Sequence, residues 1–257
     1  MLVAVTLVDI NPKMIAAWRS TFEENPEVQI VQGSMLDMPV SAWVSPTNSR
    51  GSMDGGLDLV IKKSLGAKIE KAVQQEISAR YSGSMPVGHA VCVSTGQVQP
   101  AYLISTPTMV GSSDDISDTM NVALACCAAF QAVHQQNHRS PGSIRSIAVP
   151  GLGANTGKVP VEICADLMWT AYQLFREKEF LDFNEMRTAL QEQLGDLGPM
   201  TGKTPTVKIV SDDDDDDFDE DDFDDDANPK PTSKAPQQPK SPPAKPKPAD
   251  EDFDDFD

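Results

Sequence analysis

One short stretch of the chain brings two glycines and a carboxylate to the point where a strand gives way to a helix. Val40, Ala42 and Val44 alternate with Ser41, Trp43 and Ser45, which predicts a strand, and Pro46 ends it because proline has no amide hydrogen to donate. Gly55 and Gly56 then precede an apolar pattern of helical spacing. A helix N-terminus offers unpaired N–H groups and a positive dipole end to an anion. The stretch therefore predicts an anion site, and a turn that needs glycine for geometry alone explains it equally well.

A second glycine-rich loop follows a later apolar run. Residues 144–149 predict a buried strand, and the chain continues as PGLGANTGKVP from Pro150 to Pro160. Glycine permits positive φ and lets backbone N–H groups come close to a phosphate. A plain Gly-rich turn is again the alternative for this loop alone. Two such loops, each directly after a predicted strand, favour a phosphate site.

The first stretch resembles the signature of macrodomains, the ADP-ribose-binding α/β modules. That signature runs roughly V-D-A-I-V-N-A-A-N, then a loop, then G-G-G-V-D-x-x-I, and it aligns with residues 40–61 without a gap. Asn48 falls on its last Asn, Gly55 and Gly56 on two loop glycines, and Asp58 on the following Asp. S-P-T replaces the usual N-A-A, and M-D precedes the glycine pair. These departures resemble a divergent bacterial and phage branch of macrodomain-like proteins that carry S-P-x-N-S and M-D-G-G.

The loop at residues 150–160 is similar to the second macrodomain signature, roughly F-P-A-I-S-T-G-x-x-x-x-P, which surrounds the diphosphate and the distal ribose. Its two prolines match Pro150 and Pro160 at the right separation. The resemblance implies a three-layer α/β/α fold, in which a mixed sheet carries helices on both faces. It also implies a nucleotide site at the ends of the strands, with no metal and no cofactor.

The resemblance leaves the recognition of adenine open. Gly33, Ser34 and Met35 stand at the place of the family's G-D-I, where the Asp commonly binds the adenine amino group. Ser34 has no carboxylate, so either Asp9 or Asp37 replaces it, or adenine is held less specifically. Asp9 follows the first predicted strand, where open α/β sheets bind ligands. The alternative interpretation of Asp9 is a cap that flanks the next helix.

The roles of the remaining residues also follow from the resemblance. Asn48 would hydrogen-bond the distal ribose, and Asp58 would position or deprotonate a water that attacks at that ribose. Asn48 and Asp58 are therefore the predicted catalytic residues. The predicted ligand-binding residues are Asp9, Ser34, Met35, Asn48, Gly55, Gly56, Leu57, Pro150, Gly151, Leu152, Gly153, Ala154, Asn155, Thr156 and Gly157. The expected function is binding of ADP-ribose or a related metabolite, with either no turnover or hydrolysis of an ADP-ribose derivative of phosphatase, deacylase or de-ADP-ribosylase type.

The elements that must hold these residues alternate along the chain. Apolar runs predict strands at residues 2–8, 28–31, 40–44, 90–93, 101–105 and 144–149. Helical spacing predicts helices at residues 14–23, 57–65, 67–80, 118–136 and 160–177, and around residues 186–194. The first strand, helix and strand suggest a parallel crossover, with Asn11 as N-cap and Pro12 in the first turn.

The negative charge of the chain concentrates at its end. The 257 residues carry a formal net charge of −18, and residues 212–257 hold 19 of the 39 acidic residues but only 5 of the 21 basic ones. Two Asp-rich blocks there contain phenylalanines and flank a Pro/Lys segment at residues 228–249. Low hydrophobicity and like-charge repulsion predict disorder. We therefore predict an ADP-ribose-binding domain at residues 1–200 and a disordered acidic, Pro/Lys-rich tail at residues 201–257.

The tail supports a second hypothesis, in which the protein is a non-enzymatic binding protein. Its acidic blocks would attract a basic protein partner, and Phe218, Phe223, Phe253 and Phe256 would supply apolar anchors. The alternative interpretation is a tail that only keeps the protein in solution. Salt dependence separates tail binding from nucleotide binding, since attraction between exposed charges weakens sharply with ionic strength.

Composition also excludes several classes of function. The chain has no basic stripe, so direct nucleic-acid binding is not expected. No apolar run approaches the roughly 20 residues of a membrane helix, and no basic segment with a long apolar run marks a signal peptide. Its four cysteines form no C-x-x-C pair, which indicates reduced core cysteines. The expected location is the cytoplasm, or the host cytoplasm for a viral protein.

Overall fold

The computed structural model describes residues 2, 4–178, 180 and 183–196, so the predicted tail and the domain boundary at residue 200 lie outside the described residues. Six strands form one mixed sheet in the order β2-β1-β6-β3-β5-β4, in which β4 is antiparallel to β5 and the other neighbours are parallel. The strands are β1 (Ala4–Asp9), β2 (Val28–Gln32), β3 (Ala42–Ser45), β4 (Val91–Ser94), β5 (Tyr102–Ser105) and β6 (Ser146–Val149). All six predicted strands are confirmed.

The helices are also those that the sequence predicts. They are α1 (Pro12–Thr21), α2 (Gly56–Leu65), α3 (Lys68–Tyr81), α4 (Asn121–Arg139), α5 (Val161–Glu177) and α6 (Phe183–Asp196), with a short 3-10 helix, η1 (Met35–Asp37), after β2. The start of α4 is three residues later than predicted, at Asn121 instead of Asp118. The reason is a set of contacts that the local pattern does not contain. The amide of Ile116 donates to the carbonyl oxygen of Gly157, and the hydroxyl of Thr119 donates to the carbonyl oxygen of Ile116, so this segment is held as a loop.

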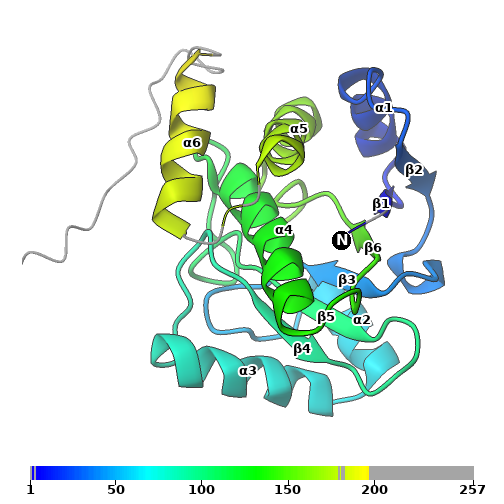
Figure 1. Ribbon diagram of the computed structural model, residues 1–257, viewed down its shortest axis with the longest axis vertical. Coiled ribbons are helices and arrows are strands. Elements are labelled where there is room, and N and C mark those ends of the chain that lie inside the picture. Colours follow the sequence, from blue (N-terminus) through cyan, green and yellow to red (C-terminus); the bar gives the residue numbers. More distant parts are fainter. Residues whose placement is uncertain (1, 3, 179, 181–182, 197–257) are drawn as a thin grey trace, which may run out of the picture. The chain divides into compact units, whose positions relative to one another are not determined.

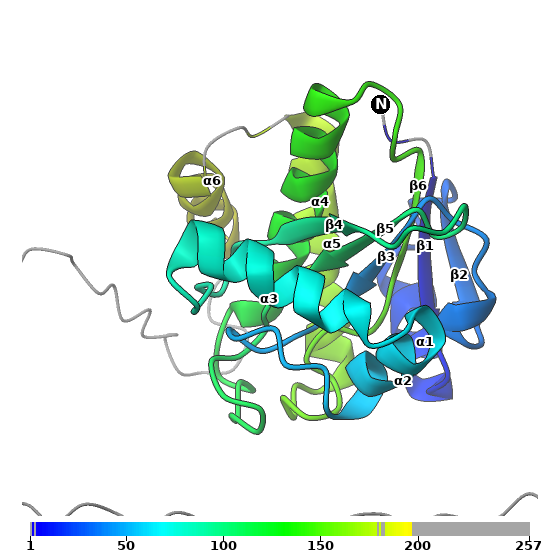
Figure 2. The same ribbon diagram turned by 90° about the horizontal axis from the view of Figure 1, so that it is seen from below.

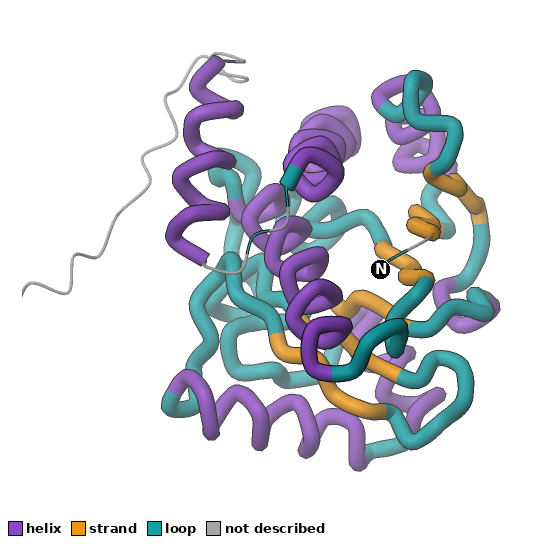
Figure 3. The backbone as a smooth tube through the Cα atoms, in the orientation of Figure 1, coloured by secondary structure: helices purple, strands orange, loops and turns teal. Residues whose placement is uncertain are grey.

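The sheet is the middle of three layers. One face packs against α1, α4 and α5, and the other against α2 and α3 (Figures 1 and 2). Successive side chains of β3 show the alternation, because Ala42 and Val44 join the first core and Trp43 joins the second. Figure 3 shows the strands between the two groups of helices. The predicted three-layer α/β/α fold is confirmed.

The first crossover forms as the sequence predicts. Strands β1 and β2 are parallel neighbours, and α1 connects them. The side chain of Asn11 accepts a hydrogen bond from the amide of Lys13, and Pro12 occupies the first turn of α1. This crossover brings the end of β1, with Asp9, to the same edge of the sheet as the ends of the other parallel strands.

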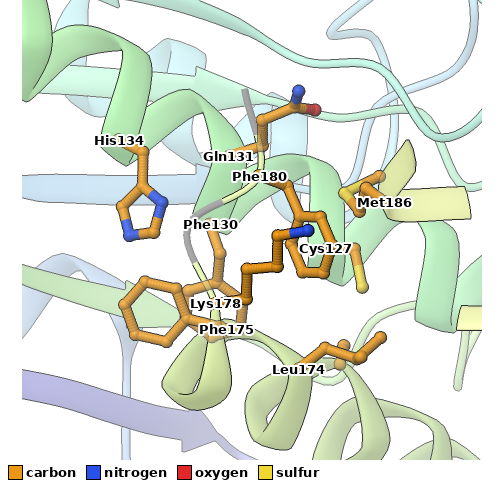
Figure 4. A pocket seen from close by; sticks show the side chains of 10 residues that line it. Cys127, Phe130, Gln131, His134, Leu174, Phe175, Lys178, Phe180 and Met186 are labelled. Carbon is orange, nitrogen blue, oxygen red and sulfur yellow. The ribbon is translucent and has the colours of Figure 1, made fainter. Parts of the chain in front are cut away.

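Helices α4 and α5 lie side by side over the sheet, and α6 packs against both. Cys126 and Cys127 in α4 and Cys164 in α5 are buried free thiols, as predicted. A small cavity between these helices is lined mainly by apolar side chains, and Figure 4 shows the stacked rings of Phe130 and Phe175 at its wall. Among the described helices, none is long and apolar enough to cross a membrane.

Candidate functional site

A cavity of about 120 Å³ opens at the edge of the sheet where four parallel strands end. Strand β1 ends at Asp9, and β3, β5 and β6 lead into the loops that complete the wall. Open α/β sheets bind their ligands at this edge. The lining residues are Asp9, Pro46, Gly55, Gly56, Leu57, Asp58, Thr108, Met109, Pro150, Gly151, Gly153, Asn155, Thr156 and Gly157. Backbone and carboxylate groups converge on this cavity, whereas the small cavity with Phe130 and Phe175 at its wall is lined mainly by apolar side chains.

The structure brings most of the predicted site residues together. The cavity lining includes Asp58 and ten of the predicted ligand-binding residues: Asp9, Gly55, Gly56, Leu57, Pro150, Gly151, Gly153, Asn155, Thr156 and Gly157. Ser34, Met35, Asn48, Leu152 and Ala154 are outside this lining. Sequence reasoning missed Pro46, which follows β3, and Thr108 and Met109, which follow β5 and therefore reach the same edge. For Thr108 and Met109, the position after a strand was the available signal, because their loop has no glycine pattern.

The N-terminus of α2 is one wall of the cavity. Gly55 is its N-cap and makes no side-chain capping hydrogen bond, so the N–H groups of the first turn have no capping partner. Gly56 has a φ of +55°, a conformation that glycine adopts without strain. Gly55, Gly56 and Leu57 all line the cavity. The wall therefore presents N–H donors and the positive end of a helix dipole.

Asp58 is the carboxylate in the first turn of this helix. The buried hydroxyl of Ser45, at the end of β3, donates a hydrogen bond to Oδ1 of Asp58. Burial raises the pKa of the Asp58 carboxyl from 3.8 to about 6, the Ser45 hydrogen bond opposes the rise, and the negative charge of Asp54 adds to it. A carboxyl that titrates near pH 6 takes up and releases protons under physiological conditions. Asp58 is therefore suited to general-base chemistry.

Asp9 ties the end of β1 to two other parts of the site. Its Oδ1 accepts from the amide of Asn11 at 2.8 Å, and its Oδ2 accepts from the amide of Gly151 at 3.2 Å. In the first contact Asp9 flanks α1 by binding the backbone N–H of Asn11, and the side chain of Asn11 is the N-cap of the helix. The second fixes the start of the glycine loop after β6 against β1. Asp9 also lines the cavity, where a ligand could reach it. Its contact with adenine stays a prediction.

Asn48 uses its side-chain amide inside its own loop. Its Oδ1 accepts from the amides of Arg50 and Ser52 at 3.0 and 3.2 Å, and its Nδ2 donates to Oγ of Ser112 at 3.1 Å. The residue is 8% exposed. Asn48 thus holds the loop before α2 in shape and joins it to the loop after β5. Its assignment to the distal ribose and to catalysis stays a prediction.

The residues at the place of the family's G-D-I have structural roles. The hydroxyl of Ser34 accepts from the amide of Leu36 and caps η1, and Met35 is buried in the core beneath α2 and α3. Ser34, Met35 and Asp37 all lie outside the cavity lining. Their roles in binding adenine stay predictions. Within the described residues, no group of three or more His, Cys, Asp or Glu side chains is placed to hold a metal ion.

The loop after β6 has a packing reason for its glycines that the sequence did not reveal. Ile116, which is buried, lies against both Gly153 and Gly157. A Cβ on Gly157 would lie 2.6 Å from Cγ1 of Ile116 and 2.7 Å from the carbonyl oxygen of Gly153. Gly153 also has a φ of +74°. Because these glycines have no side chains, Ile116 can pack directly against the loop and hold it in place. The same glycines leave their backbone exposed to the cavity.

Replacing Gly157 by Ala is expected to lower the free energy of unfolding by about 1–3 kcal/mol, because the added methyl overpacks this contact. The matched control is Gly55→Ala, whose Cβ would meet nothing within 4 Å and whose φ is −146°. That change is expected to lower stability by less than about 1 kcal/mol, the difference between Gly and Ala at an N-cap. Urea unfolding followed by circular dichroism measures both variants. Equal midpoints for the two would contradict the locking role of Ile116.

Comparison with known proteins gives consistent matches. A family model described as "Macro domain" matches residues 44–168. An uncharacterized protein of Aquifex aeolicus is 30% identical over 152 residues, which cover 59% of this chain and 84% of that protein. The O-acetyl-ADP-ribose deacetylase of Salmonella gallinarum is 24% identical over 177 residues, which cover 65% of this chain and 93% of the deacetylase. The span matched by the family model contains both glycine-bearing loops and Asp58.

Among solved structures, a macrodomain of Oceanobacillus iheyensis determined with ADP is 19% identical. It aligns with a TM-score of 0.47 and covers 64% of this chain and 88% of that one.

Proposed function

Because the chain belongs to the macro domain family, we propose that it binds ADP-ribose or a related ADP-ribosyl metabolite and hydrolyses a derivative of it with a water activated by Asp58. The observation that carries this proposal is the convergence of two glycine-bearing loops and Asp58 on one cavity. The name of the Salmonella relative, an O-acetyl-ADP-ribose deacetylase, supports an ester on the ribose as one substrate class.

The diphosphate would be held by backbone N–H groups. The first turn of α2 supplies donors on one side, and the loop from Gly151 to Gly157 supplies them on the other. No Lys or Arg belongs to the lining of this cavity in the described part of the chain. Preorganised N–H groups stabilise phosphate charge without such a cation.

The hydrolytic step assigns one task to Asp58. For an ester on the distal ribose, the ionised carboxylate takes a proton from a water, the water oxygen forms a bond to the acyl carbonyl carbon, and the bond from that carbon to the ribose oxygen, the leaving group, breaks. The leaving group then receives the proton that Asp58 holds, which restores the carboxylate. A raised pKa suits both proton transfers, because the carboxyl exists in either state near neutral pH.

Calorimetric titration of the full chain with ADP-ribose tests the binding part of this proposal. We expect saturable heat and, in an amide NMR titration, large shifts at Gly55, Gly56 and Gly153, whose residues line the cavity. A flat calorimetric trace at millimolar ADP-ribose would refute the proposal. Incubation with O-acetyl-ADP-ribose tests turnover separately. Binding without release of acetate would contradict the proposed hydrolysis of this ester and support only the binding part of the proposal.

A further inference from the structure

Ser45 is buried at the point where β3 ends. It is the last residue of β3, it is 0% exposed, and it stands in register with Ser105 of β5. Its carbonyl oxygen accepts from the amides of Thr47 and Thr106 at 3.0 and 3.1 Å. With this carbonyl oxygen held by two amides, the buried hydroxyl of Ser45 has little freedom to move away from Oδ1 of Asp58, to which it donates.

The two oxygens of Asp58 differ in their surroundings. Oδ1 accepts from Ser45, whereas Oδ2 makes no hydrogen bond to any residue that the structure describes. Asp58 lines the cavity, so a ligand or a water in it can approach the carboxyl. One oxygen is therefore anchored to the sheet and the other remains available for proton transfer.

We propose that Ser45 is a positioning residue, which anchors one oxygen of Asp58 to the end of β3 so that the other accepts the proton of the attacking water. This inference rests on the proposed hydrolysis. Ser45 does not touch the substrate in this scheme and acts only through Asp58. It also stabilises the ionised form of the carboxyl, because its O–H donates to a charged oxygen.

Other charged groups near Asp58 act in the opposite direction. Asp54, in the loop before α2, disfavours ionisation of Asp58. Asp9 of β1 is a second carboxylate on the cavity lining, and Lys62, one turn further along α2, is paired with Glu70 of α3. Neither nearby acidic residue favours the ionised form, whereas the Ser45 hydroxyl does, and so does the positive end of the α2 dipole.

The test is the pH dependence of hydrolysis by the full chain, with O-acetyl-ADP-ribose as the probe, together with a carbon-13 NMR titration of the Asp58 carboxyl. Ser45→Ala is expected to move both midpoints to higher pH by about one unit, the size of a single charge-assisted hydrogen bond. At pH 7 its kcat should fall while KM changes little, and the lost rate should return as the pH is raised. Ser45→Thr, which keeps the hydroxyl, should restore the midpoint of the wild type.

The matched control is Ser105→Ala. Ser105 is equally buried beside Ser45, but its hydroxyl is bonded to Thr47, so this variant should leave the midpoint of Asp58 unchanged. An unchanged or lower midpoint in Ser45→Ala would overturn the proposal, as would a shift of the same size in Ser105→Ala. A shifted carboxyl titration in a protein whose wild type releases no acetate would refute the hydrolase and leave the hold of Ser45 on Asp58 supported.

Discussion

Asp58→Asn is expected to lower hydrolysis of O-acetyl-ADP-ribose by about 10²–10⁴-fold, the usual contribution of a general base. Asn keeps the size of the side chain and an oxygen that accepts from Ser45, so the site keeps its shape. It lacks the carboxylate that removes the proton of the water. ADP-ribose affinity should change little, because the diphosphate is assigned to backbone N–H groups. Acetate release and calorimetry on the same preparations separate the two effects.

Asp54→Asn is the matched control for this prediction. Asp54 is an exposed Asp in the loop before α2, and its charge raises the pKa of Asp58. Removing that charge should leave catalysis in place and shift the midpoint of the pH profile to lower pH. If Asp58→Asn loses affinity and retains turnover, the assigned role of Asp58 is wrong.

The same carboxyl predicts how stability depends on pH. The pKa of Asp58 is higher in the folded protein than its ordinary value of 3.8, so the folded state binds the proton more tightly. The contribution of Asp58 to stability is therefore greatest below pH 4 and is lost as the pH rises through about 6. The shift to about 6 corresponds to at most about 3 kcal/mol. Above pH 6, Asp58→Asn should therefore unfold at a higher urea concentration than the wild type.

The regular elements could be predicted because each has a strong local pattern. In α3, Ile69, Val73 and Ile77 recur at helical spacing and form its buried face. Runs such as Ser146–Val149 have the apolar character of a strand covered on both sides. The start of α4 was misplaced because a contact with Gly157, distant in sequence, holds the preceding segment as a loop. Local periodicity carries no information about such a contact.

The candidate site could be predicted only as far as its loops follow strands. The glycines of both loops and Asp58 were found because the two loops follow predicted strands and match family motifs. Thr108 and Met109 were missed, since placing β5 beside β3 requires the order of strands in the sheet. The amide of Asn48 is bonded to Arg50, Ser52 and Ser112, contacts that the motif did not predict, and its assignment to the ribose stays a prediction. Where a side chain points depends on partners that a linear motif does not reveal.

Gly56→Val is expected to weaken ADP-ribose binding at least about tenfold, a loss of about 1.4 kcal/mol. Gly56 lines the cavity at the start of α2, where the backbone must approach the diphosphate. A valine there would place two methyl groups on the wall that presents the N–H donors. Its positive φ of 55° is also unfavourable for a β-branched residue. The loss of affinity should exceed that of Asp58→Ala, which removes the base and leaves the N–H groups untouched.

Gly66→Val separates the effect on the ligand from the effect on the backbone. Gly66 ends α2 with a φ of +89°, a Cβ there meets nothing within 4 Å, and the residue is outside the cavity lining. A Cβ on Gly56 also meets nothing within 4 Å, so the two positions differ in their place relative to the cavity and not in the space around them. Both variants should therefore lose stability in urea through backbone strain, and only Gly56→Val should lose affinity for ADP-ribose in calorimetry. Equal losses of affinity would show that strain in α2 is the cause, and the diphosphate would then have to be placed elsewhere than at the first turn of this helix.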